Sequence, residues 1–197
     1  MSGDTVPPGT EETRSTRCEI WVWRHPRPIG CEGRCIGRTD VPVDRRLAKR
    51  LARRVERAAR RLGLPRLVIT SPLRRGADVG RWLSRWGWVH RIDPSLTEMD
   101  FGEWDGKPWS TIGQAQVDAW CADFPRHAPG GGERLDAMFE RAGRWRAQGT
   151  VVVIGHAGWM LARQWLQERR EPPRTCAEWP RAPRHGALWR LSAKALD

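Results

Sequence analysis

The chain has 197 residues and a formal net charge of +12, and its 39% hydrophobic content suits one soluble domain with a buried core. No stretch approaches the ~20 uninterrupted apolar residues of a membrane-spanning helix, so we expect no membrane association. The five cysteines are odd in number and scattered, which argues against a disulfide framework and favours a reducing, cytoplasmic location.

The excess positive charge comes mainly from arginine, and much of it falls in residues 45–61. A solvated helix face accounts for such a segment without any partner, so we expect no nucleic-acid binding. Cys31 and Cys35 lie four residues apart, but no second Cys or His pair follows at zinc-site spacing. We therefore expect neither a metal nor any other cofactor.

The first predicted strand follows a polar lead-in. Residues 1–17 are polar, contain two prolines and lack the apolar region of a signal peptide, so we predict a disordered lead-in before a single domain over residues 18–197. The apolar run at residues 18–23 has the pattern of a buried strand, and it ends at Arg24, His25 and Pro26.

The next segment alternates between helical and strand patterns. Apolar residues at helical spacing predict a helix that Asp44 caps at its start and Gly63 ends. Residues 67–70 read as a second buried strand. Ser71 and Pro72 then predict a new helix, with serine as the cap and proline in the first turn, so Arg74 is expected in that first turn.

The rest of the chain continues the alternation. The strongest strand pattern, at residues 151–154, runs into Gly155-His156-Ala157-Gly158 and a further helix. The other expected elements are strands at residues 88–92 and 186–191 and amphipathic helices at residues 111–124 and 133–147. This order predicts a largely parallel sheet with helices on both faces, a fold in which ligands bind at the carboxyl ends of the strands.

Four side chains follow predicted strands and are expected to meet at that edge, namely Arg24, His25, Arg74 and His156. Two guanidinium groups suit the oxygens of a phosphate monoester, which they bind through paired hydrogen bonds. A histidine in such a pocket attacks phosphorus and forms a phosphoenzyme, which divides one difficult displacement into two. The sequence therefore predicts a small-molecule phosphate monoester as the partner.

The leaving alkoxide needs a proton, so a carboxyl group is expected opposite the nucleophile. Residues 96–103 offer three candidates, Glu98, Asp100 and Glu103, and their spacing does not choose among them. His90, His127 and His185 lie outside these motifs and receive no role.

Four motifs in order resemble the histidine phosphatase superfamily, the phosphoglycerate-mutase-like group. They are Arg24-His25-Pro26 and the segments TSPLRR at residues 70–75, TEMDFGEWDG at residues 97–106 and GHAG at residues 155–158. The resemblance extends from Cys18 to about Leu191. It implies a three-layer α/β/α sandwich with a mostly parallel central sheet and a metal-independent phosphomonoesterase.

Site roles carry over by motif. The resemblance implies that His25 is the nucleophile and that Glu98 is the general acid. It also implies that Arg24, Arg74 and His156 bind the phosphoryl group, whereas Arg75 is interpreted as a surface residue.

The substrate expectation comes from one branch of the superfamily. Pro26 after the Arg-His pair, together with GRCIGRTDVP at residues 33–42, resembles the α-ribazole phosphatases of cobalamin biosynthesis. Ile36 replaces an aromatic residue of that branch. Arg27 and Arg38 are candidates for contact with the non-phosphate part of the substrate.

Three alternatives remain beside this hypothesis. Two are enzymes, a phosphoglycerate-mutase-type enzyme and a broad-specificity histidine phosphatase. The third belongs to another class, a basic protein that binds nucleic acid or a phosphorylated ligand on an inactive phosphatase fold, and its binding would depend strongly on salt.

Overall fold

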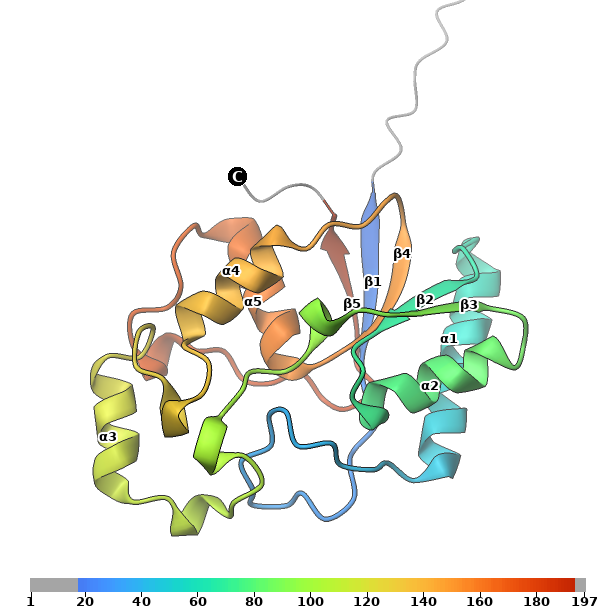
Figure 1. Ribbon diagram of the computed structural model, residues 1–197. Coiled ribbons are helices and arrows are strands. Elements are labelled where there is room, and N and C mark those ends of the chain that lie inside the picture. The colour runs from blue at the N-terminus through green and yellow to red at the C-terminus, as the bar shows by residue number, and fades with distance from the viewer. Residues whose placement is uncertain (1–17, 194–197) are drawn as a thin grey trace, which may run out of the picture.

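A computed structural model describes residues 18–193, so the predicted lead-in at residues 1–17 lies outside the described residues. One five-stranded sheet runs through the described chain in the order β3-β2-β4-β1-β5 (Figure 1). The strands are β1 (Glu19–Arg24), β2 (Leu67–Thr70), β3 (Val89–Ile92), β4 (Val151–Gly155) and β5 (Leu188–Ser192). All neighbours pair in parallel except β1 and β5, which are antiparallel.

Helices cover both faces of the sheet, which confirms the expected three-layer α/β/α arrangement. The helices are α1 (Arg45–Leu62), α2 (Arg74–Ser84), α3 (Gln114–Ala122), α4 (Leu135–Arg144) and α5 (Ala157–Glu168). One apolar cluster joins α1 and α2 to one face of the sheet, and a second joins α4 and α5 to the other. Helix α3 stands apart from the sheet (Figure 1). No helix within residues 18–193 is long and apolar enough to cross a membrane.

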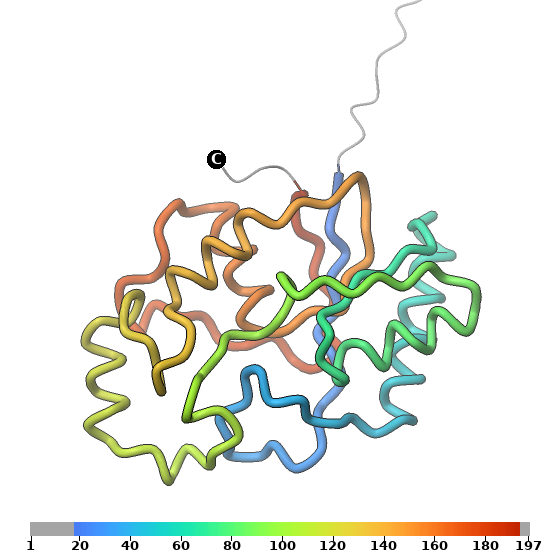
Figure 2. The backbone as a smooth tube through the Cα atoms, viewed as in Figure 1, coloured from blue at the N-terminus to red at the C-terminus, as the bar shows by residue number. Residues whose placement is uncertain are grey.

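The central strands explain the apolar runs of the sequence. Every residue of β4 is buried, because helices cover both of its faces. In β1, Ile20 and Val22 pack into the α4–α5 cluster while Trp23 packs into the α1–α2 cluster. The first and last described strands run side by side (Figure 2), and the N–H of Ala193 donates to the carbonyl oxygen of Cys18 at 2.9 Å.

Helix α1 has the ends that its sequence predicts. The carboxylate of Asp44 accepts the backbone N–H of Arg46 at 2.6 Å, so Asp44 is the N-cap. Gly63 ends the helix with φ 65°, a left-handed conformation that glycine adopts without steric cost.

The predicted start of α2 is wrong by two residues. The helix begins at Arg74 rather than at Pro72, and no side chain caps it. The physical reason is that the Ser71 hydroxyl lies 2.6 Å from Nε2 of His156, so Ser71 is tied to the end of β4 as well as to the N–H of Leu73.

The prediction for residues 111–124 is also partly wrong. Helix α3 covers only Gln114–Ala122 and contains no fully buried residue, although Val117 and Trp120 are half-buried and pack against apolar clusters. Ile112, within the range expected to be helical, is buried but precedes the helix. The expected helix at residues 133–147 is confirmed as α4, which buries Leu135, Met138, Phe139 and Ala142.

Candidate active site

Strand pairing brings two histidines together. His25 follows β1 and His156 follows β4, and the two strands are parallel neighbours with Arg24 opposite Gly155. The N–H of His25 donates to the carbonyl oxygen of Gly155 at 3.1 Å, which extends the ladder to the loop. Both rings are buried, and their centroids lie 5.0 Å apart. His25 and His156 therefore lie next to each other, as the order of the strands predicts.

The His25 ring is held in one tautomer. Its Nδ1 lies 2.7 Å from the carbonyl oxygen of Pro26, and a carbonyl only accepts, so Nδ1 carries the proton. In a neutral ring Nε2 then keeps its lone pair. Burial lowers the pKa of His25 well below its ordinary value, and the guanidinium of Arg75 lowers it further. The ring is thus neutral near pH 7, as a nucleophile must be.

The His156 ring has a protein partner on each nitrogen. Nε of Arg75 donates to Nδ1 at 3.3 Å, and Ser71 Oγ lies 2.6 Å from Nε2. Burial, followed by the charge of Arg75, lowers the pKa of His156 well below its ordinary value. A phosphoryl oxygen that binds directly to this ring must replace one of these two partners.

The structure reverses the expected positions of the two adjacent arginines. Arg75, expected on the surface, is 1% exposed and reaches His156, whereas the side chain of Arg74 is exposed. The backbone N–H of Arg74 donates to the carboxylate of Asp40 at 2.6 Å. The reason is the later start of α2, because it changes which of two consecutive residues points inward. The side chain that joins the histidines is therefore that of Arg75, and Arg74 is corrected to a surface position.

The Arg75 guanidinium is fixed by a loop. It donates to the carbonyl oxygens of Thr39, at 2.8 Å, and of Gly37. The same loop is held by Asp105, whose carboxylate accepts the backbone N–H groups of Gly37, Arg38 and Thr39. Burial acts to raise the pKa of Asp105, but hydrogen bonds from the Thr39 hydroxyl and this loop outweigh it and lower the pKa. Asp105 thus positions the loop that positions Arg75.

Arg24 has a donor available for a ligand. One of its terminal nitrogens donates to the carbonyl oxygen of Pro183 at 2.5 Å. Its Nε is buried and has no hydrogen-bond partner among residues 18–193. A buried polar atom without a partner is costly, so a ligand oxygen at this point satisfies it. Burial lowers the pKa of Arg24, and the charge of Glu98 opposes that shift, which places Glu98 beside the arginine.

Glu98 is the only one of the three candidate acids that is buried in the described structure. Its carboxylate accepts the backbone N–H of Gly158, with N–O distances of 3.0 and 3.1 Å. A Cβ atom at position 158 would lie 2.3 Å from Oε1 of Glu98, so glycine is required for this approach. Asp100 is half-buried and accepts the N–H of Gly102, and Glu103 is exposed.

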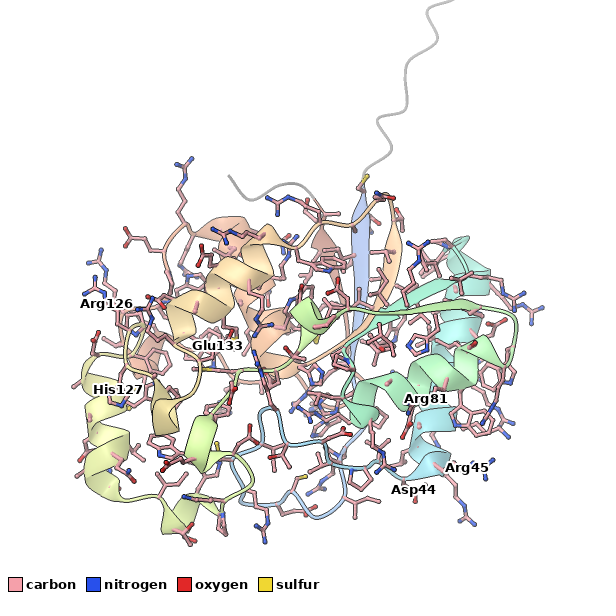
Figure 3. All side chains as sticks on the ribbon, viewed as in Figure 1. Asp44, Arg45, Arg81, Arg126, His127 and Glu133 are labelled. Carbon is pink, nitrogen blue, oxygen red and sulfur yellow. The ribbon has the colours of Figure 1, made fainter. Side chains whose placement is uncertain are left out.

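The two arginines suggested for substrate contact lie nearer the surface. Arg27 is 63% exposed and pairs with Glu32 at 2.9 Å. Arg38 is 45% exposed, and its guanidinium lies 3.6 Å from Asp100 and 3.8 Å from Glu133. Glu133 is labelled beside α4 in Figure 3. Arg38 therefore lies near the segment that carries Glu98, whereas Arg27 pairs with a residue of its own loop.

A cavity of about 170 Å³ adjoins Glu98, and no arginine is among the residues that line it. Its wall next to the acid is formed by Ala157 and Gly158. The rest of the lining is mostly apolar and includes Phe101, Trp120, Phe124, Trp179, Met99 and Met138. Trp120 lies half-buried on this cavity, and its ring centroid is 5.2 Å from that of Phe124.

A third histidine was given no role from the sequence. The ring centroid of His185 lies 5.3 Å from that of His25, although the two residues are far apart in the chain. No motif surrounds His185, so only the fold reveals its position. Within residues 18–193 no group of three or more His, Cys, Asp or Glu side chains is arranged to hold a metal ion.

Comparisons with known proteins bear on this geometry. Residues 20–176 match the histidine phosphatase superfamily (branch 1). Over 103 residues the chain is 30% identical to the adenosylcobalamin/alpha-ribazole phosphatase of Escherichia coli (strain K12). The matched region covers 47% of this chain and 51% of that protein. The chain thus spans about half the length of this curated relative.

Solved structures share the fold. The crystal structure of TTHB049 from Thermus thermophilus is similar with a TM-score of 0.60 and 30% identity, over 79% of this chain and 88% of that chain. The mycobacterial glucosyl-3-phosphoglycerate phosphatase is similar with a TM-score of 0.70 and 23% identity, over 88% of this chain and 89% of that chain. At 23% identity the second likeness concerns the fold alone.

Proposed function

This chain belongs to the histidine phosphatase superfamily, and we propose that it is a phosphoric monoester hydrolase that acts through a phosphohistidine at His25 on α-ribazole 5′-phosphate. The observation that carries the mechanism is the fixed His25 tautomer, which leaves Nε2 unprotonated beside the Arg75 guanidinium. We also propose a cytoplasmic location, which the free state of all five cysteines supports.

In the first step, Nε2 of His25 attacks phosphorus, and the bond between phosphorus and the alcohol oxygen breaks. Arg24 and Arg75 bind the phosphoryl oxygens, whose negative charge they offset. The carboxyl group of Glu98 gives its proton to the departing alkoxide. In the second step, Glu98 takes a proton from a water molecule, which attacks the phosphohistidine and releases inorganic phosphate.

The substrate proposal is supported by the cavity beside Glu98. The alcohol part of the substrate leaves on the side of the general acid, and on that side the protein offers an aromatic-lined space of about 170 Å³. Apolar cavities of about 150 Å³ bind aromatic molecules such as benzene. The bicyclic aromatic base of α-ribazole suits such a space better than a charged glycerate does. The partial match to the enzyme of Escherichia coli is consistent with this choice.

The first experiment measures phosphate release from α-ribazole 5′-phosphate, 3-phosphoglycerate and a simple aryl phosphate, with EDTA present. We expect a preference of ~10²-fold or more in kcat/KM for α-ribazole 5′-phosphate, about 2.7 kcal/mol of transition-state discrimination. Slow and equal hydrolysis of all three substrates would exclude this substrate and favour a broad-specificity enzyme. Transfer of the phosphoryl group within phosphoglycerate would favour a mutase.

The covalent step is tested by His25→Ala. Rapid quenching of the unsubstituted protein with labelled aryl phosphate is expected to trap a phosphoenzyme that acid hydrolyses and base does not. The variant should form none and should lose kcat by ~10⁴-fold or more, while keeping its thermal unfolding transition. Near-normal turnover in the variant would exclude His25 as nucleophile.

A further inference from the structure

His185 lies on a segment that is fastened to Arg24 by three hydrogen bonds. The N–H of Arg24 donates to the carbonyl oxygen of Ala187 at 2.9 Å, and the N–H of Gly186 donates to the carbonyl oxygen of Arg24 at 3.0 Å. The third bond runs from the Arg24 guanidinium to Pro183 at 2.5 Å. The segment therefore holds its position against the end of β1, and His185 is placed as firmly as the arginine itself.

The ring of His185 faces the nucleophile. Its plane is tilted 48° to that of His25, with 5.3 Å between the centroids, so the His25 ring has both His156 and His185 as neighbours. Nδ1 of His185 lies 3.3 Å from the backbone carbonyl oxygen of His25. Because a carbonyl only accepts, Nδ1 carries the proton, and Nε2 of the neutral ring keeps its lone pair. The residue is exposed, so solvent and ligands reach it.

The charged neighbours of His185 are cationic. Arg24 acts on it from the end of β1, Arg27 from the following loop and Arg75 from α2. Arg54 of α1 approaches the same segment, since its guanidinium would lie 3.0 Å from a Cβ atom at Gly186. The His185 ring keeps contact with solvent but is partly enclosed by protein. This partial desolvation, followed by the charge of Arg24, lowers the pKa of His185 to about 4, so the free imidazole is neutral at physiological pH.

From this placement we infer that His185 is a further phosphoryl-binding residue, which binds an anion in the pocket as an imidazolium. Residue 185 lies beyond residues 20–176, the part of the chain that matches the superfamily, so no comparison assigns it a role. The inference rests on the proposed function of the pocket as a phosphoryl site. Anion binding then includes a protonation of His185, a step that binding by the arginines alone does not require.

The proton balance follows from the charges. A bound dianion brings two negative charges, which offset the guanidinium charges around His185 and raise the pKa of its ring. One proton from solvent then binds to Nε2 as the anion enters and leaves when the anion leaves. Between the free and the bound pKa values, affinity falls as pH rises, by up to about tenfold per pH unit.

Sulfate is a suitable probe, because it remains a dianion over the whole pH range of interest and is not turned over. Calorimetry would compare sulfate binding at several pH values in His185→Asn, His185→Gln and the unsubstituted protein. His127→Asn is the matched control, since His127 lies at the far side of the molecule near α3 (Figure 3). At pH 6 we expect the His185 variants to bind sulfate ~10-fold more weakly, about 1.4 kcal/mol, and with a shallower pH slope.

A second readout does not depend on the variants. In protein with isotope-labelled histidines, magnetic resonance should find the His185 ring neutral at pH 6 without sulfate and protonated with it. The signal is assigned as the one missing from the variant spectrum. His25 and His156 also lie in the pocket, so the test compares sulfate binding by the unsubstituted protein with sulfate binding by the His185 variants.

The outcomes separate the two proposals. If sulfate binds the His185 variants and the unsubstituted protein equally, with the same pH slope, and the ring stays neutral, then His185 does not bind the anion and the phosphoryl site stands. If sulfate binds none of the proteins, the pocket is no phosphoryl site and both proposals fail. If the variants unfold, the protonation of the His185 ring in the unsubstituted protein on sulfate binding still decides whether His185 binds the anion.

Discussion

Glu98 adjoins two regions that are built in different ways. The first is the proposed phosphoryl pocket, where His25, Arg24 and Arg75 are each held by hydrogen bonds to backbone carbonyls. The second is the apolar cavity, whose walls come from α4, α5, the segment around α3 and the chain near Trp179. Buried polar groups require specific partners, whereas apolar walls tolerate exchange of one hydrophobic residue for another.

The difference indicates where chemistry and specificity are encoded. The residues of the phosphoryl pocket follow strand ends and belong to short sequence motifs, because each polar contact requires a particular type of side chain. The cavity leaves no motif, because many apolar combinations fill the same volume. We therefore expect substitutions in the pocket to lower activity on every substrate, and substitutions on the cavity side to depend on the leaving group.

The largest effect in this comparison is expected at the two adjacent arginines. Arg75→Ala removes the buried guanidinium that contacts His156 and that we propose binds the phosphoryl group, so kcat/KM should fall by ~10²–10³-fold on every substrate. Arg74→Ala, its matched control, changes an exposed side chain and should stay within about twofold. Steady-state kinetics with an aryl phosphate and with α-ribazole 5′-phosphate checks both. A larger loss for Arg74→Ala would restore the assignment expected from the sequence.

Glu98→Gln tests the role of the carboxyl group that adjoins both regions. An alkyl leaving group needs the proton, so its hydrolysis should slow by ~10²-fold, while an aryl phosphate with a good leaving group should slow by less than ~10-fold. Glu103→Gln, at an exposed acid of the same segment, serves as control. The measurement is the rate of phosphoenzyme formation across a series of leaving groups. An equal loss for every leaving group would remove Glu98 from the acid role.

The smallest effect is expected at Asp105, which acts on the phosphoryl pocket alone, through the loop that holds Arg75. Asp105→Asn should lower kcat/KM by only about threefold and the free energy of unfolding at pH 7 by about 1 kcal/mol. The pKa of Asp105 is lowered by folding, so its stabilisation is present above the ordinary pKa and is lost as pH falls through the lowered value.

Chemical denaturation at pH 7 and at pH 3 checks the sign of this dependence. The gap in unfolding free energy between the unsubstituted protein and Asp105→Asn should narrow at the lower pH. A gap that widens on acidification would mean that the carboxylate does not stabilise the loop.

Much of the fold followed from local patterns. The strand before His25 and the helix from Asp44 to Gly63 were predicted correctly, because burial and capping are recorded in neighbouring residues. The meeting of His25 with His156 followed from parallel strand order. The choice between Arg74 and Arg75 failed because it depends on where α2 begins, which a contact of Ser71 with a distant strand end decides.

Two parts of the site were out of reach of the sequence. His185 approaches His25 through a segment that precedes the last strand, and no spacing rule connects the two residues. The cavity depends on how Trp120 of α3 packs against Phe101 and Phe124, which lie on other segments of the chain than α4 and α5. Long-range packing, rather than local propensity, decides both.

The position of β1 in the sheet has a consequence for synthesis of the chain. This strand is made first, yet its partners come last, since Ile20 pairs with Val151 and Glu19 with Ser192. At ~5–20 residues per second, a ribosome needs on the order of ten seconds to extend the chain from β1 to these partner strands. Throughout this interval the apolar β1 has no strand partner and is open to aggregation, which makes it a target for a chaperone. The proposed catalytic pocket therefore forms only after β4 and β5 have been synthesised, and we expect a chain truncated before β4 to be inactive.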